Sequence, residues 1–233
     1  MADVSVEAAG ITGLTIRWAA GSVDVAVIDD AGAHAIELTE TAPRPLGEAQ
    51  RMRWRVVGST LEVEFGSWFE CFLLGRKDLE ARIPRAFASA FERVSVEGSS
   101  GLYQVRDIGC GTMKLKLASG RIDVDRVAAR GLSIDVASGY VSAVGRFDES
   151  VRAHVASGEI RVLCDGPCPQ SIDADIASGS VRLAIPASSG FTARITKASG
   201  AFKSGFPLEQ ASQTVGIDEN GNATLTFFAN YIA

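Results

Sequence analysis

The residues in this sequence whose types could bind a metal ion or catalyse a reaction are two carboxylates and an imidazole in its second half. Asp135, His154 and Asp175 are of the types that hold a metal ion or serve as the acid and base groups of a sugar-cleaving enzyme. They are 19 and 21 residues apart. Two basic residues nearby, Arg161 and Arg182, could contact an acidic partner.

The charges around these residues favour a simpler interpretation. Lys116 precedes Asp135 by 19 residues and Arg152 precedes Asp173 by 21, so opposite signs follow one another at the same spacing. In stacked parallel strands such residues lie side by side and fix the strand register. We therefore predict a charge ladder on a solvated face and a protein that is not an enzyme, with no metal and no cofactor. A metal or carbohydrate-active site on this face is the alternative.

The four cysteines do not suggest a disulfide framework. Cys164 and Cys168 enclose Asp165-Gly166-Pro167, but a structural zinc ion needs about four ligands and no further Cys or His lies near this pair in sequence. We expect free thiols in a protruding loop.

The spacing of these residues follows a repeated Ala-Ser-Gly motif. It occurs at 118–120, 137–139, 156–158, 177–179 and 198–200, so its glycines are 19, 19, 21 and 21 residues apart. Glycine permits a sharp corner between strands, and the serines either bond the corner backbone or form a ladder that binds a glycan. The predicted corner residues are Ser119, Gly120, Ser138, Gly139, Ser157, Gly158, Ser178, Gly179, Ser199 and Gly200.

Apolar side chains keep one register from repeat to repeat. Counted from the glycines at 120, 139, 158 and 179, all 20 residues at positions −7, −5, −3, +2 and +4 are apolar, and those between them are almost all polar. Such alternation is typical of strands with one buried face. Val136 and Ile176 are therefore predicted to point inward, and Ser142 outward.

These patterns predict an all-β fold, a single-stranded parallel β-solenoid with about 19–21 residues per coil. Parallel crossovers are nearly always right-handed, so we expect a right-handed β-helix. Asn220-Gly221 between two apolar runs predicts a C-terminal hairpin that caps the last sheet edge.

The whole chain is predicted to form one solenoid domain. Residues 1–93 would hold degenerate coils and a cap, 94–205 the regular coils, and 206–233 the C-terminal cap. Within the first part, the runs on either side of Gly58-Ser59 suggest a hairpin, and the aromatic stretch 68–74 suggests an insertion that caps the core or docks a partner.

The N-terminal apolar pattern around Gly21, the Ile83-Pro84 dipeptide and the serial Ala-Ser-Gly coils together resemble a known bacterial family. It is the β-strand-repeat domain called "putative adhesin", whose function is essentially unknown. The resemblance implies a right-handed β-helix and a location at the cell surface or outside the cell. It implies no catalytic residues.

Composition and charge bear on the kind of partner and on the location of the protein. With 23 Lys+Arg against 28 Asp+Glu the net charge is −5, which disfavours nucleic acid as a partner. The sequence holds no long apolar run and does not start with a secretory signal, so a cytoplasmic protein without a transmembrane segment is expected from the residues alone.

We therefore expect a non-enzymatic scaffold or binding protein, adhesin-like, with an unknown protein or glycan as its partner. Two alternatives stay open: a carbohydrate-binding or carbohydrate-active β-helix, and a cytoplasmic self-assembling β-helix. A homo-dimer is also possible on these grounds.

Overall fold

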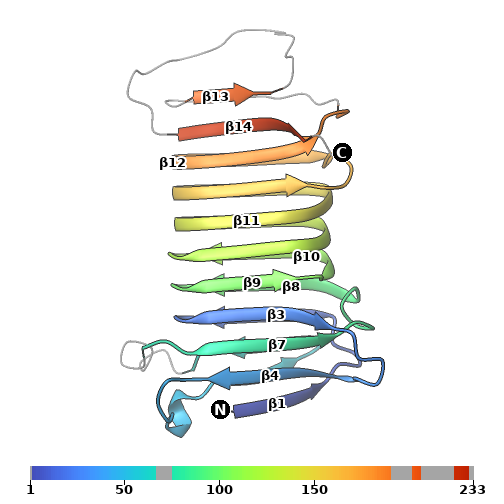
Figure 1. The fold of residues 1–233 in the computed structure, drawn as a ribbon, viewed down its shortest axis with the longest axis vertical. Helices are drawn as coiled ribbons and strands as arrows, with labels where there is room; N and C mark the ends of the chain where they lie inside the picture. Colours follow the sequence, from blue (N-terminus) through green and yellow to red (C-terminus); the bar gives the residue numbers. More distant parts are fainter. Residues whose placement is uncertain (1, 67–74, 190–200, 206–222, 231–233) are drawn as a thin grey trace.

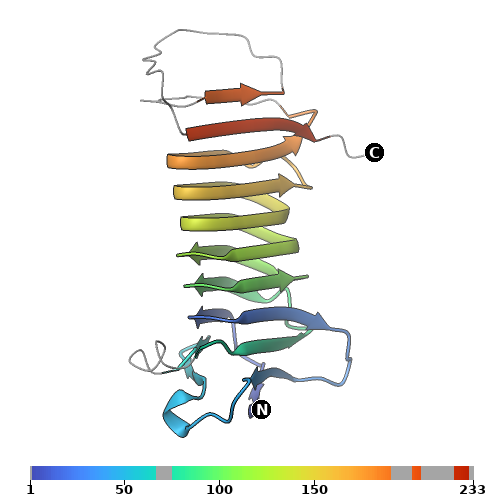
Figure 2. The same ribbon diagram turned by 60° about the vertical axis from the view of Figure 1, so that its left-hand side comes forward.

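A computed structural model describes residues 2–66, 75–189, 201–205 and 223–230 of the chain. Its strands lie one above another along the longest axis of the molecule, with the N-terminal strands at one end (Figure 1). Figure 2 shows the same stacking after a turn of 60°. Hydrogen bonds between neighbouring strands therefore run along the long axis.

Almost all regular structure in the described part of the chain is β-strand, because alternating and β-branched residues dominate it. A short 3-10 helix, η1 (Glu48–Gln50), is the exception. The strands are β1 (Ala2–Glu7), β2 (Gly13–Trp18), β3 (Ser22–Ile28), β4 (Ala35–Thr41), β5 (Arg53–Val57), β6 (Thr60–Glu64), β7 (Asp78–Pro84), β8 (Phe91–Gly98), β9 (Leu102–Arg106), β10 (Gly109–Leu117), β11 (Arg121–Cys164), β12 (Ser171–Pro186), β13 (Ala201–Ser204) and β14 (Ala223–Asn230).

The described strands belong to one mixed sheet. Eleven of them follow one another in the order β1-β4-β7-β3-β9-β11-β10-β8-β2-β6-β5, and β12, β13 and β14 extend the sheet from β11. The pairs β1/β4, β4/β7 and β5/β6 are antiparallel, and the other pairs are parallel. This path curls into a half-barrel whose two ends, β1 and β5, both belong to the N-terminal part of the chain.

The prediction of a single-stranded, purely parallel β-solenoid is therefore wrong. The antiparallel pairs overturn it, and the connection between β5 and β6 gives a physical reason. A loop of two residues can join only antiparallel strands, since a parallel pair needs a crossover of a dozen residues or more. The same pairing confirms the hairpin predicted around Gly58-Ser59.

The predicted C-terminal capping hairpin is not found among the described residues. Strand β14 lies between β12 and β13 and pairs with both in parallel. The proposed turn at Asn220-Gly221 and the aromatic stretch 68–74 lie outside the described residues, so the structure does not address the cap or the insertion.

The inward and outward positions predicted from alternation are confirmed. Val136 is fully buried, Ile176 packs partly against the core, and Ser142 is half-buried on the outer side. Parallel pairing sets Met113 beside Leu132, 19 residues on, and Val151 beside Ile172, 21 residues on. One continuous cluster of buried apolar side chains results, from Val6 to Ile185.

Glycines form a close-packed column where the sheet bends. A Cβ atom added to Gly139 would lie 2.7 Å from the carbonyl oxygen of Gly120, and one on Gly158 would lie 2.4 Å from that of Gly139. Gly179 repeats this arrangement, with 2.2 Å to the oxygen of Gly158. At Gly139 and Gly158 the requirement for glycine therefore comes from this close approach, since neither has a positive φ.

Candidate functional site

The free edge of β5 is an exposed apolar surface at the N-terminal end of the sheet. Among the described residues β5 pairs only with β6. Its side chains Trp54, Val56 and Val57 are 43%, 44% and 53% exposed. The partners of Trp54 and Val56 on β6, Val63 and Leu61, are fully buried. An unpaired edge with exposed apolar side chains is a template for binding another strand.

The hairpin loop decides which backbone groups face this edge. Gly58 at the loop has a φ of 61°, which glycine adopts without strain, and Val57 pairs with Thr60 across a two-residue loop. The pair that flanks such a loop is hydrogen-bonded, and hydrogen-bonded pairs alternate along the strand. The N–H and C=O groups of Trp54 and Val56 consequently point away from β6, towards the free edge.

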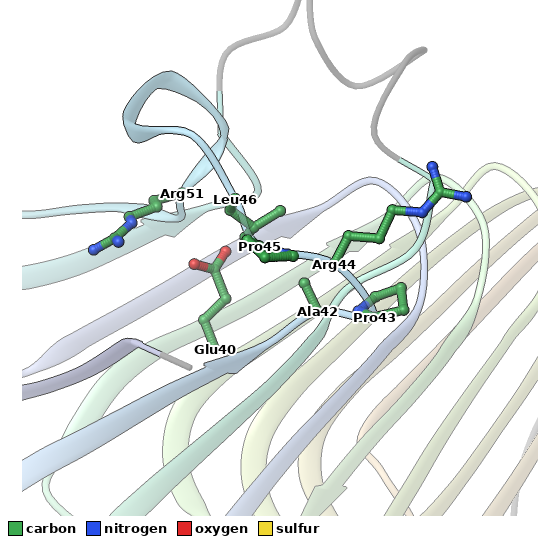
Figure 3. Close-up of a pocket in the computed structure, with 7 residues that line it drawn as sticks. All are labelled: Glu40, Ala42, Pro43, Arg44, Pro45, Leu46 and Arg51. Carbon is green, nitrogen blue, oxygen red and sulfur yellow. The ribbon is translucent and has the colours of Figure 1, made fainter.

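A pocket of about 410 Å³ lies beside the segment that leads into β5. It is lined by Glu40 at the end of β4 and by the chain that follows, and the guanidinium groups of Arg44 and Arg51 extend to opposite sides of it (Figure 3). Glu40 is 1% exposed, and its Oε2 atom has no hydrogen-bond partner in the described structure.

Beneath this pocket Lys77 and Glu40 form a buried ion pair. Lys77 Nζ donates to Glu40 Oε1 at 2.5 Å, to the carbonyl of Gln50 at 2.8 Å and to the carbonyl of Phe65. The same nitrogen lies 4.3 Å from the centre of the Phe65 ring and 5.1 Å from that of Trp18. These contacts tie β4, η1 and the end of β6 together, so they hold the base of the β5 hairpin in place.

Sequence analysis missed this cluster. Glu40 carried a usable signal, because it continues the inward parity of Ile36 and Leu38 in β4 and therefore interrupts an apolar series. Lys77 lies outside any strand, so alternation gives no sign that it is buried.

Of the three predicted acid and base residues, the structure brings two into contact. His154 Nδ1 lies 3.3 Å from Asp175 Oδ2, on side chains that are 52% and 80% exposed. Asp135 pairs across the sheet with Lys116. The described residues contain no group of three or more His, Cys, Asp or Glu side chains that could hold a metal ion.

Arg161 and Arg182, the basic residues predicted to contact an acidic partner, form ion pairs within the chain. Arg161 Nε and Arg182 Nη1 lie 2.7 and 3.2 Å from the same oxygen of Glu159. Arg161 also lies over the ring of Tyr140 at 5.5 Å. Their role in binding a partner stays a prediction.

The serines of the repeated motif are exposed where the structure describes them. Ser119 Oγ donates to the carbonyl of Ser99 at 3.1 Å, and Ser157 pairs with Ser178 in the parallel register. Ser199 and Gly200 lie outside the described residues. The contact of Ser119 agrees with bonding to the corner backbone.

The cysteines in the described segments are free. Cys164 ends β11 inside the core, so it does not lie in a protruding loop as predicted, whereas Cys168 is half-buried. Burial raises the pKa of Cys164 and of Cys110 to about 12. Both thiols are consequently unreactive near neutral pH.

Together these features define an all-β protein built on one curled mixed sheet, with an open and apolar strand edge at its N-terminal end. The chain belongs to the Toastrack DUF4097 family, whose model matches residues 2–228. The resemblance to an all-β family of unknown function is confirmed at that level.

Two further similarities are more limited. A stretch of 27 residues is 78% identical to the fimbrial-like protein FimF of Salmonella typhimurium strain LT2, and it covers 12% of this chain and 16% of that protein. A "putative cell adhesion protein" from Clostridium sporogenes shares 10% identity over 98% of both chains, with a TM-score of 0.43. Within the described residues no helix has the length and apolar character needed to span a membrane.

Proposed function

We propose that this chain is a non-enzymatic binding protein that captures an extended segment of a partner protein on the free edge of β5. The observation that carries the proposal is the exposure of Trp54, Val56 and Val57 on a strand whose second edge is unpaired in the described structure. Adding a strand there satisfies backbone groups and covers apolar surface in one step.

The surroundings of β5 support capture at this edge. The buried pair of Lys77 and Glu40 fixes the chain before and after the hairpin, so the edge is held ready for binding. Pairing with Glu62 holds Arg55 on the outer side of β5, with 2.5 Å between Arg55 Nη2 and Glu62 Oε2, and leaves the inner side to Trp54 and Val56.

A proline substitution in β5 tests the proposal. Random peptides of about eight residues displayed on phage are selected on the immobilised chain, and the selected peptides are titrated by fluorescence anisotropy. Val56→Pro removes an amide that faces the free edge, so binding should weaken about tenfold or more. Val56→Ile keeps the amide, the β-branched shape and the apolar surface, and should bind like the wild type.

Two results would contradict strand capture at β5. One is equal binding of the selected peptides to the wild type and to Val56→Pro. The other is a selection that yields no peptide protecting the amides of Trp54 and Val56 from hydrogen exchange.

A further inference from the structure

The outward side chains next to the free edge form a ladder of alternating charge. The pairing register places one of them on each of six neighbouring strands, and the ladder crosses β11, β10, β8, β2, β6 and β5. Its members are, in order, Asp135, Lys116, Glu97, Arg17, Glu64 and Arg53.

Part of this ladder consists of direct ion pairs. Arg17 Nη1 lies 3.1 Å from Glu64 Oε1, and Arg17 Nε lies 3.7 Å from Glu97 Oε2. The last member, Arg53, forms none of the ion pairs found among the described residues. The ladder thus ends on a positive charge at the open edge, with Arg55 beside it on the same face.

The inward side chains of the same strands form apolar ladders. One runs through Val96, Ile16 and Val63, which are fully buried, and ends on the exposed Trp54 of β5. A second apolar ladder runs through Leu14 and Leu61, which are buried, and ends on the exposed Val56. In the described structure no further strand covers the last residue of either ladder.

We propose that the segment captured by β5 alternates acidic and apolar residues. This inference rests on the proposed function and names the chemistry of the partner. Acidic side chains continue the outward ladder beyond Arg53 and Arg55, and apolar side chains cover Trp54 and Val56 on the inner side. Both requirements fall on one strand with a period of two, because successive side chains point to opposite faces.

Three synthetic peptides of about eight residues separate these requirements: alternating Glu and Val, alternating Thr and Val, and alternating Lys and Val. All three alternate with a period of two and carry the same apolar face of Val residues. Their affinities for the wild type are measured by anisotropy at low ionic strength, where exposed charges interact best. The expected order is Glu/Val, then Thr/Val, then Lys/Val, with about three- to tenfold between the first two.

A charge reversal tests the assignment to the ladder. Arg53→Glu should remove the preference for the Glu/Val peptide over the Thr/Val peptide, because it replaces the terminal positive charge of the ladder and leaves only Arg55 beside it. Arg93→Glu changes the net charge equally on β8, at an exposed residue outside the free edge, and should leave the order unchanged.

The outcomes distinguish the two proposals. If the Thr/Val peptide binds as tightly as Glu/Val, or if Arg53→Glu leaves the order unchanged, the acidic pattern is wrong, and loss of binding in Val56→Pro still supports strand capture. If none of the peptides binds, or if Val56→Pro binds them as the wild type does, strand capture itself is wrong.

Discussion

At the residue scale, the buried pair of Lys77 and Glu40 is the most consequential contact at the N-terminal end. Replacing Lys77 by Met leaves a buried carboxylate without its cation, so the free energy of unfolding should fall by about 3–5 kcal/mol. Urea unfolding followed by circular dichroism measures the change.

A double variant supplies the control. Glu40→Gln removes the charge but keeps an oxygen that can accept the amide of Met52, which lies 2.8 Å from Glu40 Oε1. In the Lys77→Met background it should restore most of the lost stability. Unchanged stability of the single variant Lys77→Met would show that the pair contributes little.

Tyr103 gives a prediction with a pH dependence. Burial raises the pKa of its hydroxyl from 10.0 to about 12, and that hydroxyl lies 2.8 Å from the carbonyl of Trp18. Between these two values the unfolded chain loses the proton and the folded chain keeps it, so stability falls as the pH rises from 10 to 12.

Comparison with Tyr103→Phe separates the pH dependence of stability caused by the Tyr103 hydroxyl from that caused by the buried thiols. The variant should be less stable than the wild type by about 1 kcal/mol near pH 8. The difference should shrink above pH 10, because only the wild type loses stability through this hydroxyl. A difference that stays constant from pH 8 to pH 11 would be inconsistent with a raised pKa.

Sequence reasoning reached some of these residues and not others. Alternation predicted the buried Val136 and could have found Glu40, since both follow the parity of their strands. It could not find Lys77, whose burial depends on carbonyl groups of Gln50 and Phe65 that only the folded chain brings together. The exposure of Trp54 was equally hidden, because it depends on β5 being the last of the described strands at its end of the sheet.

At the scale of elements, inward and outward positions should differ sharply in their tolerance of charge. Val136→Asp buries an unpaired carboxylate and should unfold or aggregate the protein. Ser142→Asp, on the outer side of the same strand, should change the melting temperature little. Equal melting temperatures for the two variants would contradict the assignment of the faces.

The glycine column makes a second prediction at this scale. The new Cβ in Gly139→Ala would lie 2.7 Å from the carbonyl oxygen of Gly120, so the two chain segments must separate, at a cost of about 1–3 kcal/mol. Ser138→Ala, next to it and exposed, should cost under about 0.5 kcal/mol. Denaturant midpoints of the two variants measure the difference.

The sequence predicted the individual strands better than their arrangement. Alternation defines a strand and its buried face, and the two-residue loop at Gly58-Ser59 defines one antiparallel pair. The antiparallel pairing of β4 with β1 and β7 depends on long-range contacts, such as Leu38 with Ala81, which no local pattern specifies. The error in fold class arose from extending the regular repeat to the whole chain.

At the scale of the whole molecule, the continuous core predicts cooperative unfolding. Trp18 is 1% exposed at the N-terminal end, and its fluorescence should change at the same urea concentration as the circular dichroism of the sheet. The measurement uses a variant in which Trp54 and Trp68 are replaced by Phe. A fluorescence midpoint well below the dichroism midpoint would show that the N-terminal layers melt separately.

The orientation of β5 also has a mechanical consequence. A strand bound beside it lies across the long axis, so tension applied along that bound strand loads all its hydrogen bonds in shear at once. Tension along the long axis would instead peel neighbouring strands apart in turn. A partner attached at β5 is therefore best held when the pulling direction follows the strands, and it is released most readily by a pull at right angles to them.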